Sequence, residues 1–153
     1  MNPPHRISTH ISRQALERVV PDGWYVDSQM PITLSRSEPE PDVSVVRGDT
    51  RNYADRRPGP AEVGLVMEIA DTSLERDSIR KKRIYAAAGI PYDWLLNLKT
   101  RSLEVYSVPQ GNEYTRRGFT DLSRRWTWSW MGKLWERCVL AICSLTKPAA
   151  LFH

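Results

Sequence analysis

The stretch AEVGLVMEIADTSLERDSIRKKRIYAAAG, residues 61–89, decides the fold. Its first part, residues 61–70, is an almost continuous apolar run, which is typical of a central strand covered on both faces. Glu68 interrupts this run, and a carboxylate buried in such a strand is costly unless it is paired, protonated or bound to a metal. Glu68 is therefore a candidate functional residue. The alternative is that it lies at the strand end and contacts water.

The second part of the stretch, residues 72–88, is predicted to form a helix. Thr72 and Glu75 fit a capping box at its start. Gly89 supplies a left-handed cap at its end, and Pro91 prevents the helix from continuing. The stretch therefore predicts a buried strand that leads directly into a helix.

One face of this helix carries Asp77, Lys81, Ile84, Tyr85 and Ala88 at helical spacing. The last three residues indicate that this face is buried. Asp77 and Lys81 lie at its N-terminal end, next to the loop from the preceding strand, so they could reach carboxylates on the adjoining strands. The alternative is an ordinary i,i+4 ion pair on a solvated shoulder, and spacing alone does not separate the two.

The flanking segments predict a mixed sheet around this unit. We expect a helix at residues 8–20, strands at 24–26, 30–34, 42–46, 92–98 and 102–108, and an exposed loop at 47–60. This order predicts the α/β fold class, with a mixed β-sheet core flanked by helices. From residue 119 onward neither pattern holds, which fits either an extension that closes the sheet or a frame-shifted sequence.

Composition and charge exclude several classes of protein. The chain has 153 residues, 26% of them charged and 41% hydrophobic, which fits one globular domain and not a disordered or membrane protein. Cys138 and Cys143 are too few for a disulfide framework or a zinc site. With neither a long apolar run nor the apolar core of a signal peptide, a soluble cytoplasmic protein is expected.

The basic character of the chain belongs to its C-terminal part. The net charge is +4, but residues 116–153 carry +5 and residues 1–115 carry −1. The same tail holds four of the six tryptophans. The overall charge is therefore not evidence that the main body binds nucleic acid.

Two acids on neighbouring strands and a nearby lysine suit phosphodiester hydrolysis. Asp42 opens one strand, Glu68 lies on the next, and Lys81 follows on the helix. Asp42 and Glu68 could hold Mg²⁺, or Mn²⁺ as its substitute, which polarises a phosphate and activates a water. Lys81 would then stabilise the developing negative charge or orient the water. The histidines do not have the spacing of a metal-binding pair.

Five segments in order resemble the Uma2 (Uma-two) family of bacterial restriction-endonuclease-like proteins. They are EPEPDVSVV at residues 38–46, VMEIADTS at 66–73, DSIRK at 77–81, YAAAGIPYDW at 85–94 and LEVY at 103–106. Each segment alone is weakly specific, but their order and spacing together are specific. The resemblance implies the PD-(D/E)XK nuclease fold and Mg²⁺-dependent cleavage of DNA.

By this resemblance, Asp42 is the motif aspartate, Glu68 the second acid and Lys81 a lysine displaced onto the helix. Asp77 matches a position that is often acidic and is a possible supporting residue. The resemblance implies a restriction-endonuclease-like domain at residues 1–117, without the helix and hairpin that usually open the family. Residues 118–153 form a divergent basic tail.

Three functions remain open at this point. The first is a metal-dependent endonuclease that hydrolyses phosphodiester bonds in DNA. The second is a catalytically inactive nuclease-fold remnant that binds nucleic acid or another protein, with a homodimer as one form. The third is a structural interaction protein that uses the tryptophan-rich tail. The set Asp42, Glu68 and Lys81 favours the first.

Overall fold

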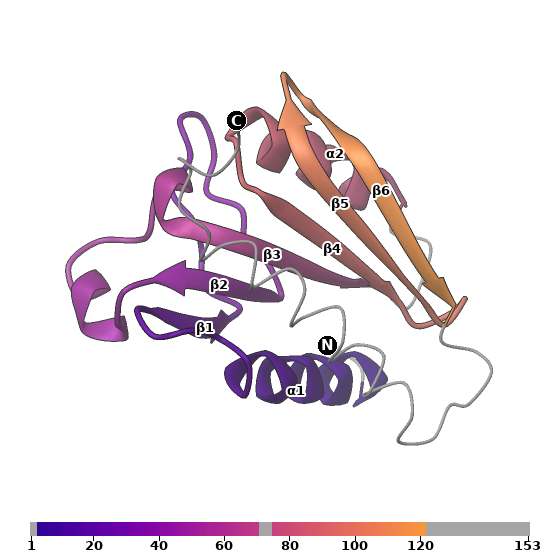
Figure 1. Ribbon diagram of the computed structural model, residues 1–153, viewed down its shortest axis with the longest axis horizontal. Coiled ribbons are helices and arrows are strands. Elements are labelled where there is room, and N and C mark those ends of the chain that lie inside the picture. The colour runs from indigo at the N-terminus through magenta and orange to yellow at the C-terminus, as the bar shows by residue number, and fades with distance from the viewer. Residues whose placement is uncertain (1–2, 71–74, 122–153) are drawn as a thin grey trace.

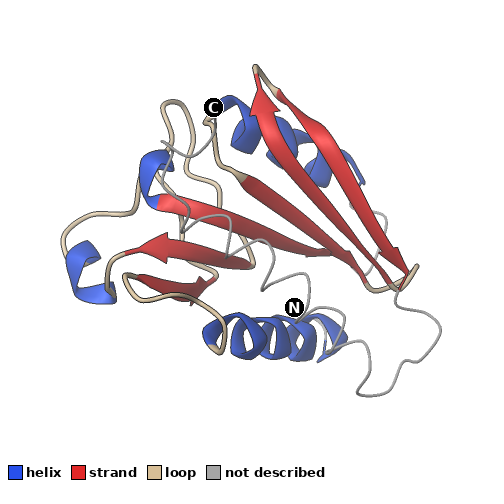
Figure 2. Cartoon of the chain, in the orientation of Figure 1, coloured by secondary structure: helices blue, strands red, loops and turns tan. Residues whose placement is uncertain are grey.

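The computed structural model describes residues 3–70 and 75–121, and these residues form a six-stranded mixed sheet, two α-helices and two short 3₁₀ helices (Figures 1 and 2). The elements are α1 (Pro3–Glu17), β1 (Trp24–Ser28), β2 (Val43–Arg47), η1 (Thr50–Tyr53), η2 (Pro60–Glu62), β3 (Val63–Ala70), α2 (Glu75–Ala87), β4 (Tyr92–Asn97), β5 (Ser102–Gln110) and β6 (Glu113–Asp121). The strands lie in the order β1-β2-β3-β4-β5-β6. Among these described strands, β3 and β4 pair in parallel and are joined by the α2 crossover, and the other neighbours are antiparallel.

The two helices cover different faces of the sheet. Every residue of β3 is buried, and from Leu65 to Ile69 its apolar side chains alternate between two clusters. Leu65 and Met67 pack in one cluster with Leu16 of α1, whereas Val66 packs in the other with Tyr85 of α2. The central strand predicted from the apolar run is therefore confirmed. Its even positions, which include Glu68, face α2.

The end of α2 has the predicted glycine cap. Gly89 has a φ of +76°, a left-handed conformation that is strained for a residue with a side chain. Its N–H donates to the carbonyl of Ala86 at 3.0 Å, and the Ile90 N–H donates to the carbonyl of Tyr85 at 3.1 Å. These two bonds form a Schellman motif. The predicted N-cap, Thr72, lies outside the described residues.

The predicted strand at residues 30–34 is wrong. The Ile32 N–H donates to the carbonyl of Pro39, and the Leu34 N–H donates to that of Ser37, each at 2.9 Å. The segment thus folds back on itself without joining the sheet. Pro31 within it lacks an N–H group and cannot donate to a ladder. Ile32 is still fully buried, so the apolar pattern indicated burial and not strand pairing.

The first helix begins and ends earlier than predicted. It ends at Glu17, and a turn follows in which Val19 and Val20 donate their N–H groups to the carbonyl of Leu16. Both valines still pack against the core, which explains why the apolar spacing extends beyond the helix. The loop expected at residues 47–60 contains the short helix η1. No helix in residues 3–70 and 75–121 is long and apolar enough to cross a membrane.

Strand β6 was not predicted from the sequence. All of its residues are exposed or half-buried, and it lacks the apolar alternation of a strand with one covered face. Its register with β5 runs from Glu113 to Asp121, and it crosses the domain end expected at residue 117. The rest of the tryptophan-rich tail, with both cysteines, lies outside the described residues.

We predict that Gly89→Ala destabilises the protein by about 1–2 kcal/mol, because the left-handed conformation at this position is energetically unfavourable for alanine. Gly59→Ala is the matched control. Gly59 has an ordinary φ of −92°, and a Cβ there would meet other atoms only at normal contact distances. Urea unfolding measures both changes. Equal free energies of unfolding for the two variants would contradict the capping role.

Candidate active site

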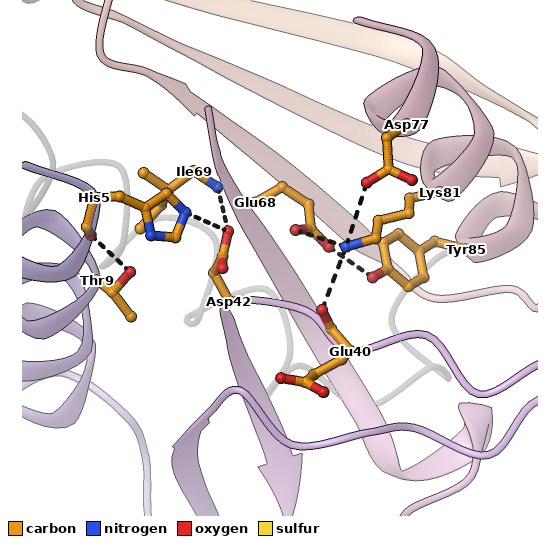
Figure 3. A network of polar contacts seen from close by, with 9 residues as sticks. All are labelled: His5, Thr9, Glu40, Asp42, Glu68, Ile69, Asp77, Lys81 and Tyr85. Carbon is orange, nitrogen blue, oxygen red and sulfur yellow. Dashed lines mark hydrogen bonds and ion pairs between the residues drawn. The ribbon is translucent and has the colours of Figure 1, made fainter. Parts of the chain in front are cut away.

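Glu68 lies on β3 with its carboxylate turned toward α2 (Figure 3). The residue is only 8% exposed. Its Oε1 accepts a hydrogen bond from the Tyr85 hydroxyl at 2.7 Å, and its Oε2 lies 3.4 Å from the Lys81 Nζ. The buried carboxylate therefore has two partners, one turn apart on the same helix.

Lys81 joins three parts of the chain through its ammonium group. Besides contacting Glu68, its Nζ donates to the backbone carbonyl of Glu40 at 3.3 Å and lies 3.8 Å from the Asp77 carboxylate. The Lys81 side chain is 23% exposed, whereas that of Asp77 is 56% exposed. The helix register predicted for Lys81 is confirmed, and Asp77 lies at the solvent side of the same contact.

Asp42 lies just before β2, beside the end of β3. Val43 pairs with Met67 in the antiparallel ladder, so Asp42 and Glu68 are the next residues beyond that pair. The Asp42 carboxylate accepts a hydrogen bond from the Ile69 N–H at 2.8 Å, and its Oδ2 lies 3.4 Å from the Nε2 of His5. Figure 3 shows this group on the α1 side and Glu68 on the α2 side.

The structure therefore arranges the predicted residues in two adjacent groups. Lys81 contacts both Glu68 and Asp77, whereas Asp42 is held by partners of its own. Within residues 3–70 and 75–121, no three His, Cys, Asp or Glu side chains form a metal-binding group. The catalytic and metal-binding roles of these residues stay predictions.

Two contacting residues were not predicted as part of the site. Tyr85 was placed on the buried face of its helix, and its spacing of four from Lys81 could have indicated that both reach one carboxylate. His5 lies far from Asp42 in the sequence, and no pattern in its helix pointed to that contact. It is held near Asp42 only because α1 packs on β2 and β3.

Burial raises the pKa of Glu68 to about 7, from an ordinary value of 4.5. The nearby Asp42 carboxylate raises it further, whereas Lys81 and the Tyr85 hydrogen bond oppose the rise. Burial also raises the pKa of Tyr85 well above its usual range, so its hydroxyl keeps the proton that it donates. Glu68 therefore changes charge near neutral pH.

A second buried carboxyl group, that of Asp93, lies on β4. Asp93 is 4% exposed and pairs with Val66 of β3 in the parallel register. Burial and the nearby Glu68 charge hold the pKa of Asp93 well above its usual range. The α2 side of β3 and β4 therefore carries two acids that resist ionisation together.

A family model described as "Putative restriction endonuclease", Uma2, matches residues 1–132. The chain belongs to the Uma2 family. The resemblance seen in the five sequence segments is thus confirmed. The comparison with curated proteins finds no match.

A solved structure has a fold similar to that of this Uma2 protein. It is described as a putative nuclease belonging to DUF820 from Anabaena variabilis. The match has a TM-score of 0.63 and covers 93% of this chain and 83% of the other, at 13% sequence identity. This similarity confirms the α/β, restriction-endonuclease-like fold class predicted from the sequence, with its mixed sheet and flanking helices.

We predict that Glu68→Gln becomes more stable relative to wild type as the pH rises from 4.5 to 7. The folded-state pKa is raised, so between these values folded Glu68 keeps a proton that the unfolded chain releases. Rising pH therefore removes stability from wild type but not from the glutamine variant. Between pH 4.5 and 7, the free energy of unfolding of the variant relative to wild type should rise by at most roughly 3 kcal/mol. Urea unfolding across this pH range measures the change.

Glu62→Gln serves as the control for this prediction. A hydrogen bond from Arg56 lowers the pKa of Glu62 to about 2, so this group is ionised in both the folded and unfolded chain above pH 5. The change in the free energy of unfolding caused by Glu62→Gln should therefore be constant from pH 5 to 8. A constant difference for Glu68→Gln as well would contradict the raised pKa of Glu68.

Proposed function

We propose that this Uma2 protein is a metal-dependent endonuclease that hydrolyses phosphodiester bonds in DNA. The observation that supports this most is the buried Glu68 carboxylate, held by Lys81 beside Asp42 at the end of β3. Family membership supports the reaction class. Asp42, Glu68 and Lys81 are the proposed catalytic residues, and a DNA substrate implies action in the cytoplasm.

Asp42 and Glu68 are the residues that would hold Mg²⁺, or Mn²⁺ in its place. Both offer carboxylate oxygens, the ligands that Mg²⁺ prefers, and Mg²⁺ needs only one or two carboxylates because it keeps several waters. A carboxylate has about four lone-pair positions, and each of these two has only two partners among the described residues. The donor set therefore fits the metal, which when bound polarises the phosphate and lowers the pKa of a bound water.

The surrounding residues prepare the two acids for this role. Tyr85 fixes one oxygen of Glu68, and Lys81 favours its ionised form. The Ile69 N–H and His5 orient Asp42. In the reaction, the Lys81 ammonium would stabilise the negative charge that develops on the phosphate. Asp77 would support this by holding Lys81 from the solvent side.

The second candidate is a catalytically inactive nuclease-fold module that binds nucleic acid or a protein partner, with a homodimer as one form. The observation that favours it is the separation of the acids into two groups. Asp42 is engaged by α1, and residues 3–70 and 75–121 contain no group of three metal-ligating side chains. Activity and metal binding distinguish the two candidates.

We expect the purified protein to nick plasmid DNA in Mn²⁺, and Asp42→Ala, Glu68→Ala and Lys81→Ala each to lower the rate by at least about 100-fold. Lys82→Ala is the matched control, because Lys82 is the next residue on α2 but its ammonium lies over the Tyr106 ring. Activity that survives all three substitutions would contradict the proposed site.

Metal binding gives an independent prediction. Millimolar Mn²⁺ should raise the Tm of wild type by about 2–4 °C for each kcal/mol by which the bound metal stabilises the folded state, a stabilisation equal to RT ln(1 + [Mn²⁺]/Kd). Glu68→Ala should lose this shift because it lacks a ligand, whereas Lys81→Ala should keep it. The same shift in wild type and Glu68→Ala would place the metal elsewhere. A metal shift without nicking would favour the inactive module.

A further inference from the structure

A small pocket lies beside Lys81, between residues 37–39 and α2. It has a volume of about 210 Å³, and Lys81, Asp77, Arg80 and Ile84 form its α2 side. Lys81 also contacts Glu68, so one side chain belongs to both the candidate active site and the pocket. Any group bound in this pocket would therefore lie next to the proposed reaction centre.

The charged groups of the pocket differ in how far they are already paired. Lys81 is shared by Glu68 and Asp77. Glu38 pairs with Arg57 and accepts a hydrogen bond from a threonine hydroxyl. Arg80 is exposed and forms no ion pair with the described side chains, those of residues 5–70 and 77–121. The guanidinium of Arg80 is thus the cation of this pocket that is available to an anion.

We propose that this pocket binds the phosphate next to the scissile one on the DNA strand, with Arg80 as its anchor. This inference rests on the proposed endonuclease function and adds a substrate-binding residue to it. A guanidinium matches phosphate oxygens with two parallel hydrogen bonds. The negative charge of Asp77 repels an anion from the side of the pocket that Asp77 lines, so the phosphate would lie toward Arg80 and Lys81.

The size of the pocket supports a sugar–phosphate unit as its occupant. Pockets for drug-sized ligands measure roughly 300–1,000 Å³, and this one is smaller. Ile84, which lies between Arg80 and the buried face of α2, supplies an apolar wall for the deoxyribose ring. A phosphate with its sugar fits this combination of one cation and one apolar side chain.

Arg83 provides a matched control on the same helix. It is exposed, as Arg80 is, and lines a neighbouring, more open hollow with Ile79, Arg80 and Ile84. It does not line the pocket beside Lys81. The two arginines therefore have the same charge and the same helical context, but only one faces the proposed phosphate.

The test measures binding of a fluorescein-labelled 20-base-pair DNA duplex to the full chain by anisotropy, in EDTA so that no cleavage occurs, from 50 to 200 mM KCl. Arg80→Ala should raise Kd about tenfold and reduce the slope of log K against log salt by about 1. Arg83→Ala should change neither. Arg80→Lys should restore the salt slope but only part of the affinity, because lysine lacks the paired donors.

Two results would overturn the inference, and they are distinguishable. If wild type binds the duplex but Arg80→Ala and Arg83→Ala have equal effects, or Arg80→Ala has none, the pocket is not the phosphate site and the endonuclease proposal is unaffected. If wild type does not bind the duplex at any salt concentration, either in EDTA or with Ca²⁺ in its place, the DNA-directed function itself is contradicted. Thermal unfolding of each variant checks that substitution at these exposed positions leaves the fold intact.

Discussion

A carboxylate on a fully buried central strand requires partners, and Glu68 finds them on α2. Lys81 and Tyr85 are one turn apart on that helix, so the contact with Glu68 fixes both the rotation and the depth of α2 against the sheet. The helix is also the crossover between the parallel strands β3 and β4, and its end is set by the Gly89 cap. Breaking such a pair by removing one partner leaves an uncompensated buried charge, so this polar contact constrains the packing around it.

The site forms where two helices from different faces of the sheet reach the same end of β3. From one face, α2 supplies Lys81 to Glu68, and from the other, α1 brings His5 to Asp42 (Figure 3). The Ile69 N–H, on β3 itself, connects the two groups by donating to Asp42. The acids are therefore close in the sheet but differently held, and burial raises the pKa of Glu68 to about 7.

Much of this arrangement could be predicted from the sequence, because it follows from local periodicity. The apolar run predicted β3, and the stripe that includes Tyr85 placed Lys81 on the buried face of its helix, although spacing alone did not separate a contact with the carboxylates of the sheet from an exposed ion pair with Asp77. Three features could not be predicted. The contact of His5 with Asp42 depends on long-range packing of α1, β6 lacks an alternating apolar face, and the apolar pattern of residues 30–34 buries Ile32 in a folded-back segment that does not join the sheet.

The central claim is that Asp42 and Glu68 act as one metal site although each has its own partners. The most direct measurement is a crystal structure of the protein soaked in Mn²⁺, with an anomalous difference map calculated at the manganese edge. We predict a peak within coordination distance of both carboxylates, with Lys81 retained beside Glu68. A bound Mn²⁺ that contacts neither acid, or only one of them with the other still held by its helix, would contradict the claim.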